Sequence, residues 1–160
     1  MCGITGFWGH HSGDLRALAQ RMGQAMRTRG PDDDGVWEDR EQGLAFCHRR
    51  LSIIDLSPEG HQPMVSASGR YVIVFNGEIY NFKDLRAELE TAGDRFRGHS
   101  DTEVFLAAFE RFGIKATLQR AVGMFAFAVW DKQAKQIVLG RDRIGEKPLY
   151  YGHVGKAFVF

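Results

Sequence analysis

The chain has 160 residues, the size of one ordinary domain, and its 44% hydrophobic and 26% charged side chains are typical of a folded rather than a disordered protein. It carries 21 basic and 20 acidic side chains, so its net charge is +1. This balance gives no reason to expect a nucleic acid or an anionic membrane as the main partner.

The first third of the chain predicts strands around one helix. Residues 2–9 form the first expected strand. Apolar residues at helical spacing then predict a helix over 14–28, which ends at the Arg-Gly-Pro-Asp segment 29–32. Two further strands are expected at 36–38 and 44–50.

The middle of the chain predicts one strong strand followed by helices. The strand is 71–76, where YVIVFN is rich in β-branched and aromatic residues. Asn81 is the expected cap of a helix over 82–92. Ser100 and Glu103 have the spacing of a capping box, which opens a helix that ends near Gly113, and a short helix is expected at 114–121.

The last part of the chain predicts strands again, at 124–131, 136–141, 148–152 and 156–160. The sequence stops at KAFVF, inside the last of these strands, so we expect a piece of a longer polypeptide. Strands at both ends with helices between them indicate a layered α+β domain built on antiparallel sheets.

The chain has two cysteines, Cys2 and Cys47, which do not make a disulfide framework, and its histidines show no metal-ligand spacing. Its first residues do not resemble a signal peptide, and no stretch approaches the roughly 18 apolar residues of a membrane span. We therefore expect a cytoplasmic protein with free thiols and no bound metal.

The second residue has the chemistry of a nucleophile. Removal of Met1 is common before a small residue, and it would leave Cys2 with a thiol and a free α-amine. An α-amine titrates near pH ~7.7 and a thiol near ~8.5, so one residue would supply both base and nucleophile. Taken alone, a cysteine at position 2 is more often incidental. Cys47, in the segment LAFCH, is expected to be a core residue of a strand.

Four polar or flexible positions would suit an amide-hydrolysing thiol. Asn76 and Gly77, at the end of the strand 71–76, offer two N–H donors to an oxyanion, although Asn-Gly alone more often marks a hairpin turn. Arg50 could bind a carboxylate and Asp101 an ammonium group. Taken singly, each is more often a solvated strand-end charge or a charge at a helix N-terminus.

Seven segments in order carry a family resemblance: MCGITG, RTRGPDDDG, HRRLSIIDLSPEGHQPM, VFNGEIYNF, HSDTEVFLAAFERFG, VGMFAFAVWD and GRDRIGEKPLYYG. Together they resemble the class II glutamine amidotransferase domain, and NGEIYN and GHQPM are similar to its asparagine synthetase branch. The resemblance covers nearly the whole chain. Each segment alone is of modest specificity, whereas the ordered set is highly specific.

The resemblance implies the N-terminal nucleophile hydrolase fold, an αββα sandwich of two antiparallel sheets flanked by helices, with residues 1–160 as one glutaminase domain. It implies that Cys2 is the nucleophile and, through its amine, the base, and that Asn76 and Gly77 form the oxyanion hole. The other implied positions are Arg50 for the substrate carboxylate, Asp101 for the substrate amine, Glu78 in the same pocket, Leu51 and Ile53 as backbone contacts, and Gly30 and Pro31 in the loop beside the nucleophile.

The implied reaction converts glutamine to glutamate and ammonia through a Cys2 thioester. In this branch a C-terminal synthetase domain, which is missing from these 160 residues, uses the ammonia for an ATP-dependent amidation in asparagine biosynthesis. ATP and Mg are expected only in that domain, and this domain is expected to need no cofactor. The ammonia acceptor and the oligomeric state stay open, with a homodimer among the alternatives.

Two other classes of function stay open at this point. One is a different N-terminal nucleophile amidase or acylase on the same fold. The other is a non-catalytic binding or regulatory module, or an inert fragment that needs its synthetase half. A nucleic-acid module is disfavoured by the near-neutral charge.

Overall fold

The computed structural model describes residues 1–9, 13–52 and 57–160. In chain order its elements are β1 (Gly3–Trp8), α1 (Leu15–Gln24), β2 (Asp33–Asp39), β3 (Leu44–Arg50), a 3-10 helix (Pro58–Gly60), β4 (Met64–Val65), β5 (Tyr71–Ile79), α2 (Phe82–Thr91), α3 (Asp101–Phe112), α4 (Ile114–Arg120), β6 (Gly123–Asp131), β7 (Gln136–Arg141), β8 (Gly152–Val154) and β9 (Ala157–Val159).

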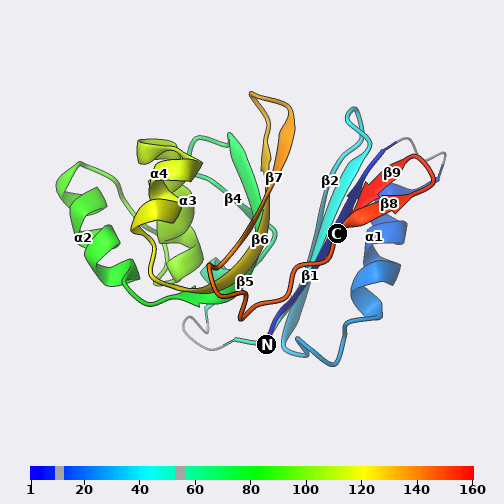
Figure 1. The fold of residues 1–160 in the computed structure, drawn as a ribbon, viewed down its shortest axis with the longest axis horizontal. Coiled ribbons are helices and arrows are strands. Elements are labelled where there is room, and N and C mark those ends of the chain that lie inside the picture. The colour runs from blue at the N-terminus through cyan, green and yellow to red at the C-terminus, as the bar shows by residue number, and fades with distance from the viewer. Residues whose placement is uncertain (10–12, 53–56) are drawn as a thin grey trace.

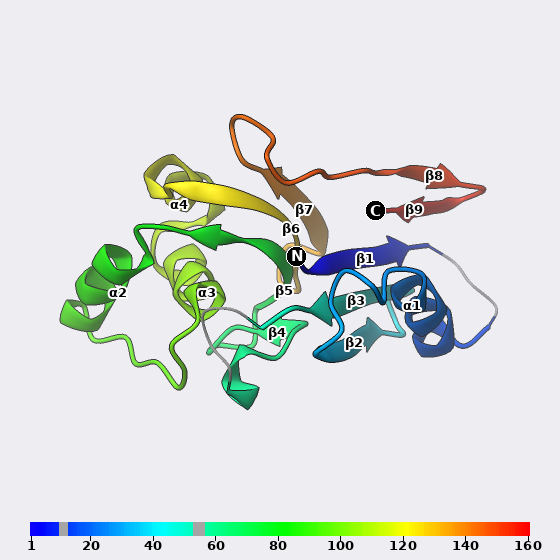
Figure 2. The same ribbon diagram turned by 90° about the horizontal axis from the view of Figure 1, so that it is seen from below.

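The strands of the described residues form two antiparallel sheets. One sheet has the order β2-β3-β1-β9-β8 and the other β4-β5-β6-β7. The sheets stand side by side in the middle of the molecule, with α2, α3 and α4 outside one of them and α1 outside the other (Figure 1). The view turned by 90° shows α2, α3 and α4 on the side of β5 and β6, and α1 next to β2 and β3 (Figure 2). The expected αββα sandwich is therefore confirmed.

Alternating side chains explain why β5 is buried on both faces. Val72 and Val74 point between the sheets, where they pack in a cluster with Leu44, Phe46 and Trp130. Ile73 and Phe75 point the other way, against the helices. Successive side chains of a strand face opposite sides, so a strand covered on both sides needs an unbroken apolar run.

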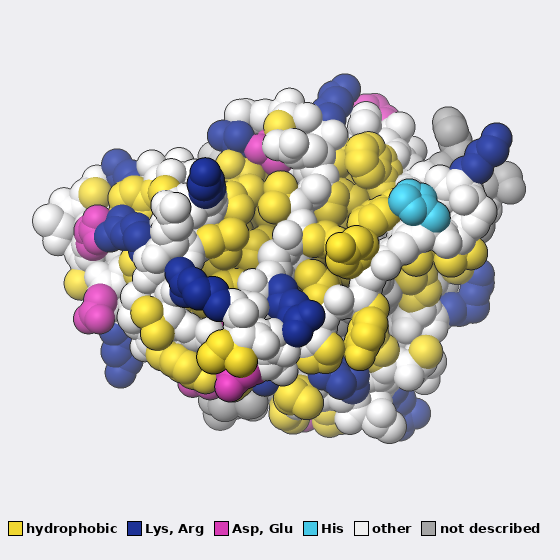
Figure 3. Space-filling model, in the orientation of Figure 1, with side chains coloured by type: hydrophobic (Ala, Val, Ile, Leu, Met, Phe, Trp, Pro, Cys, Tyr) yellow, Lys and Arg dark blue, Asp and Glu magenta, His cyan; other side chains and the backbone are white. Residues whose placement is uncertain are grey.

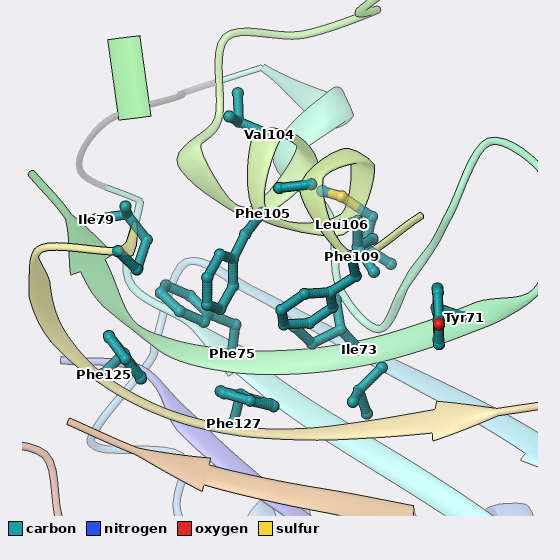
Figure 4. Packing of buried hydrophobic residues seen from close by; sticks show 14 of the residues in the cluster. Tyr71, Ile73, Phe75, Ile79, Val104, Phe105, Leu106, Phe109, Phe125 and Phe127 are labelled. Atoms are coloured by element: carbon teal, nitrogen blue, oxygen red, sulfur yellow. The ribbon is translucent and has the colours of Figure 1, made fainter. Parts of the chain in front are cut away.

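The helices cover the outer face of β5 and β6 through a cluster of aromatic rings. Phe105 and Phe109 of α3 pack on Phe75, Phe125 and Phe127 of the sheet (Figure 4). Phe105 alone has ring neighbours at centroid distances of 4.5 Å to 5.8 Å. Offset and edge-on rings at these distances are favourable, so this cluster fixes α3 on the sheet.

Helix α1 packs on the other sheet through small and apolar residues. Leu15 and Ala19 lie against Phe7 and Ala45, together with Cys47. Cys47 is 2% exposed, and burial raises the pKa of its thiol to about 11. The expectation that Cys47 is a core residue of a strand is therefore confirmed.

Several sequence predictions differ from the structure in length or position. The helix expected over 14–28 ends at Gln24, because Met26 N–H bonds back to Gly23 in a turn. The strand expected at 71–76 continues to Ile79, so Asn76-Gly77 lies inside β5 and is not a hairpin turn. The strand expected at 148–152 is wrong: apart from Gly152, which opens β8, these residues pair with no described strand.

The two expected helix caps are realised only in part. Ser100 Oγ accepts from Glu103 N at 3.2 Å, but the Glu103 carboxylate accepts from Arg97 N and Gly98 N instead of completing the box. Asn81 precedes α2 without capping it. Its side chain bonds Arg120 O and Val122 N, which ties α2 to the start of β6.

Apolar side chains also reach the surface on one face. In the space-filling view they gather in the middle of the molecule, where Figure 1 places the two sheets (Figure 3). Among the described residues, no helix is both long and apolar enough to cross a membrane.

We expect Phe105→Ala to lower the free energy of unfolding by about 3–5 kcal/mol, because Phe105 is 1% exposed and its loss leaves a cavity among the surrounding rings. Val122→Ala, at a side chain that is 56% exposed, should change it by less than about 0.5 kcal/mol. Urea unfolding of the two variants and the parent chain measures both. Equal small effects would contradict the assigned core.

Candidate functional site

One pocket brings together the site residues that the sequence analysis singled out. Its lining includes Cys2, Arg50, Leu51, Asn76, Gly77, Glu78 and Asp101. Ile53 lies outside the described residues. The pocket is formed where β1 begins, β3 ends and α3 begins, beside the later part of β5. Residues from four elements therefore meet at one end of the sandwich.

The strand alternation explains why polar side chains meet here. On β3, Leu44 and Phe46 point between the sheets, and residues 48 and 50 share that face. On β5, Val72 and Val74 share it with Asn76, and on β1, Ile4 shares it with Cys2. On β3 and β5 the inward row is apolar in one half and polar in the half at the pocket end. The site is thus the polar end of the sandwich interior.

Cys2 is held against the backbone that follows β3. Leu51 N–H donates to Cys2 Sγ at 3.4 Å, and Cys2 Sγ lies 3.6 Å from Leu51 O. Arg29 Nε donates to Cys2 O at 3.1 Å. Arg29 directly precedes Gly30 and Pro31, so this loop does lie beside Cys2. Gly30 itself packs on β3, where a Cβ would lie 2.3 Å from the Arg49 carbonyl carbon.

Beyond the short pairing with β4 at Val72 and Ile73, the outer edge of β5 is satisfied by side chains instead of a strand. Phe75 N–H donates to Gln62 Oε1 at 2.7 Å, and Ile79 N–H donates to Asp101 Oδ2 at 2.9 Å. N–H groups two residues apart on a strand point the same way, so the Gly77 N–H between them faces the same side. Among the described residues, no side chain accepts a hydrogen bond from this N–H group. A backbone donor is therefore open at the pocket.

Gly77 has a steric reason to be glycine. A Cβ at this position would lie 2.3 Å from Met124 O and 2.6 Å from Phe125 Cα on β6. Asn76, the preceding residue, is 5% exposed, and its side-chain amide makes no hydrogen bond to the described part of the chain. Two adjacent positions thus offer unsatisfied N–H groups to one pocket.

Arg50 is buried, at 8% exposure, so the alternative of a solvated strand-end charge is wrong. Its Nη1 donates to Ser57 O at 3.0 Å. Gly60 makes room for the guanidinium, because a Cβ there would lie 2.1 Å from Arg50 Nη2. The fork of an arginine can bind a carboxylate through two parallel hydrogen bonds.

Asp101 is the first residue of α3 and is 5% exposed. Burial raises the pKa of its carboxyl, while the hydrogen bond from Ile79 N–H opposes that shift. Glu78 lines the same pocket from β5 and is only partly buried. The pocket therefore presents a cation on the β3 side and two carboxylates on the β5 and α3 side.

His48 joins the two sheets beneath the pocket. It is fully buried on β3, and its Nε2 lies 3.0 Å from Phe75 O on β5, so the ring donates this proton. Its Nδ1 has no partner among the described residues. Burial lowers the pKa of this imidazole to about 4, and the ring is neutral at pH 7.

Sequence reasoning missed several residues of this pocket, among them the polar side chains Gln62 and Lys147. Both lie within segments that carried the resemblance, GHQPM and GRDRIGEKPLYYG, but nothing in their spacing assigns them a place. Gln62 bonds Thr102 Oγ1 as well as Phe75 N–H. Within the described ranges, no three His, Cys, Asp or Glu side chains gather to hold a metal ion.

Comparison with known proteins gives a consistent result. The family model described as "Glutamine amidotransferase domain" matches residues 1–160. "Asparagine synthetase [glutamine-hydrolyzing] 1" of Bacillus subtilis (strain 168) is 42% identical, over 100% of this chain and 25% of its own length. The protein numbered 3 of the same name and strain is 39% identical, over 100% of this chain and 26% of its own length. The chain thus spans about a quarter of these relatives.

A solved structure shares the fold. It is described as "glutamine phosphoribosylpyrophosphate (PRPP) amidotransferase from B. subtilis complexed with ADP and GMP". Its TM-score is 0.81 at 21% identity, and the match covers 98% of this chain and 40% of that one. This similarity concerns the arrangement of the two sheets and their helices.

We expect His48 to make the fold less stable as the pH falls from about 6.5 to about 4. In this range the unfolded chain takes up a proton on the imidazole that the folded chain does not, so stability decreases with decreasing pH. His48→Gln lacks this titration. Between pH 7 and pH 4.5 the parent should therefore lose about 2 kcal/mol more than the variant in urea unfolding. Equal losses would contradict a neutral buried imidazole.

Proposed function

The chain belongs to the glutamine amidotransferase family, and from this premise we propose that it hydrolyses the side-chain amide of glutamine with Cys2 as the nucleophile. The observation that carries the proposal is the pocket itself. A thiol, two open N–H donors, a buried arginine and a buried carboxylate face one space at the polar end of the sandwich. That set matches the groups of a free amino acid with an amide.

The nucleophile needs a chain that begins at Cys2. Once Met1 is removed, the α-amine of Cys2 accepts the thiol proton, directly or through a water, and the thiolate attacks the amide carbon of glutamine. The C–N bond breaks, the nitrogen takes up the proton, and ammonia leaves. Water then attacks the thioester and releases glutamate, which returns the thiol to its starting state.

The developing oxyanion is bound by Asn76 and Gly77. The side-chain amide of Asn76 and the backbone N–H of Gly77 are fixed on a strand that is paired over its whole length with β6. They change little on reaction, so their dipoles stabilise the transition state without reorganisation. Their lack of partners in the described structure supports this role.

Substrate recognition follows from the charges. Arg50 binds the α-carboxylate, Asp101 binds the α-ammonium group, and Glu78 adds negative charge beside it. The backbone of Leu51 completes the contacts. This pair of opposite charges favours free glutamine over the larger amides that other N-terminal nucleophile amidases hydrolyse.

The ammonia would be used outside these 160 residues. The relatives are about four times longer and are named as glutamine-hydrolysing asparagine synthetases. By analogy, a C-terminal synthetase domain in the cytoplasm would couple the ammonia to a carboxylate acceptor activated with ATP and Mg. The names of the relatives give only the product, asparagine, so aspartate is one choice of acceptor among carboxylates.

A second candidate function is glutamine binding without hydrolysis. Met1 lines the same pocket. A chain that keeps Met1 has no free amine on Cys2 and would act as a binding module.

Replacing the nucleophile should abolish the reaction. We expect Cys2→Ala to lose all measurable glutaminase activity and to escape the single adduct that a glutamine-mimicking electrophile forms with the processed chain. Cys47→Ala removes the other thiol, which is buried, and this variant should keep both the glutaminase activity and the adduct. Intact mass before and after treatment reports the removal of Met1 and the adduct. Hydrolysis by Cys2→Ala would sink the proposal.

The oxyanion role of Asn76 has a separate test. Asn76→Ala should lower turnover about 100-fold or more, which corresponds to about 3 kcal/mol, with little change in the KM for glutamine. Asn81→Ala, at the only other asparagine, removes a structural tie outside the pocket and should keep turnover while lowering stability. If Asn76→Ala stays within tenfold of the parent, Asn76 is not an oxyanion donor.

A further inference from the structure

The segment GRDRIGEKPLYYG has no role in the reaction described so far, although it is ordered around one carboxylate. Asp142 accepts from the N–H groups of Ile144, Glu146 and Lys147 at 3.0 Å to 3.1 Å, and from Phe125 N–H of β6 at 3.2 Å. Burial raises the pKa of Asp142, but these hydrogen bonds outweigh it and lower the pKa to about 2. The loop 142–147 is therefore tied to β6 at neutral pH.

This loop places the side chain of Lys147 in the lining of the pocket. Lys147 is 8% exposed and lines the same space as Cys2, Asn76 and Gly77. Its Nζ lies 3.4 Å from Sδ of Met1, the residue that precedes Cys2. Within the described residues it forms no ion pair. A largely buried ammonium without a carboxylate is costly, so its position calls for a functional reason.

We propose that Lys147 is the residue that holds processed Cys2 in its reactive form, with the amine unprotonated and the thiolate favoured. This inference rests on the proposed function, because it assumes that Met1 is removed. Removal takes away the methionine side chain that Lys147 touches and creates the new amino group in the pocket that Lys147 lines.

The physical reason is the sign of the charge. A cation within about 4–6 Å opposes protonation of an amine and favours a thiolate. The two titrations belong to one residue and are coupled, so Lys147 lowers the pH at which Cys2 as a whole loses its first proton. For a cation about 5 Å away in a partly solvated pocket, the effect is about one pH unit.

The other charges near Cys2 do not replace this effect. They are Arg29 and Arg50 on the cationic side and Glu78 and Asp101 on the anionic side. Arg29 is bonded to the backbone oxygen of Cys2, and Arg50 is bonded to Ser57 O and faces the substrate carboxylate. The carboxylates oppose the cations. Lys147 is the cation whose side chain contacts Met1, the residue that precedes Cys2.

The test measures the reactivity of the thiol, which does not require catalysis. The rate of alkylation of Cys2 by iodoacetamide is followed against pH by intact mass, on chains whose loss of Met1 has been checked. Cys47 stays silent, because it is buried and its thiol has a pKa of about 11. Three variants are compared with the parent: Lys147→Met, Lys147→Arg and Lys135→Met.

Lys147→Met should raise the pH midpoint of alkylation by about one unit, whereas Lys147→Arg keeps the charge and should stay near the parent. Lys135→Met removes the same charge from the exposed turn between β6 and β7, at the far end of β6 from the pocket, and should have no effect. The acid limb of kcat/KM for glutamine should move with the alkylation midpoint. A purely structural role would lower the rate without moving the midpoint.

Two results would overturn the inference. One is a pH midpoint in Lys147→Met that equals that of the parent. The other is a midpoint shift in Lys147→Arg as large as that in Lys147→Met, because the effect would then depend on the shape of the side chain and not on its charge. If Lys147→Met does not fold, Lys147→Gln takes its place. If Lys147→Met shifts the midpoint but the parent chain does not hydrolyse glutamine, this inference is supported and the proposed function is rejected. If the parent chain hydrolyses glutamine and Lys147→Met leaves the midpoint unchanged, the proposed function is supported and this inference is rejected.

Discussion

The structure depends on the inward-facing rows of three strands. On β3 and β5 these rows are apolar in one half, where Leu44, Phe46, Val72 and Val74 pack the two sheets together, and on β1 Ile4 packs against the same cluster. Sheets that pack face to face lie about 10 Å apart, so side chains at the same end of facing rows can share one space. Where the rows turn polar, the packed interior becomes a pocket. Position and chemistry of the site thus follow from one packing arrangement.

On one edge of β5, β4 pairs only with Val72 and Ile73, and side chains take over the hydrogen bonds of the part that follows. Gln62 and Asp101 accept from the N–H groups of Phe75 and Ile79, and His48 donates to Phe75 O from the facing sheet. A buried donor without an acceptor costs about 1–3 kcal/mol, so most of the edge is satisfied. The Gly77 N–H is the exception, and it is the donor that an oxyanion would use. Stability is given up where the substrate is expected to bind.

The fold was largely predictable, and the misses have causes that lie outside the local sequence. Strand 44–50 was predicted with its observed bounds, because both of its faces are covered and its pattern has no competing signal. Asn76-Gly77 would allow a turn by local preference, but its pairing with β6 keeps it in the strand. Pro148 to Tyr151 reads as a strand, yet Tyr150 and Tyr151 are 83% and 69% exposed and no described strand pairs with them. In each case a long-range contact, or its absence, outweighed local propensity.

The sequence by itself determined the identities and the order: a thiol at position 2, the period-two rows, and a set of segments specific enough to name the family. Gathering these groups into one pocket was a prediction from that resemblance, and their catalytic roles stay predictions. Only the tertiary structure decided which groups meet. Leu51 reaches Cys2 over 49 positions, and Lys147 reaches Met1 over 146. Such contacts depend on how two sheets and a loop pack, and packing is set by the whole chain rather than by the residues near each site.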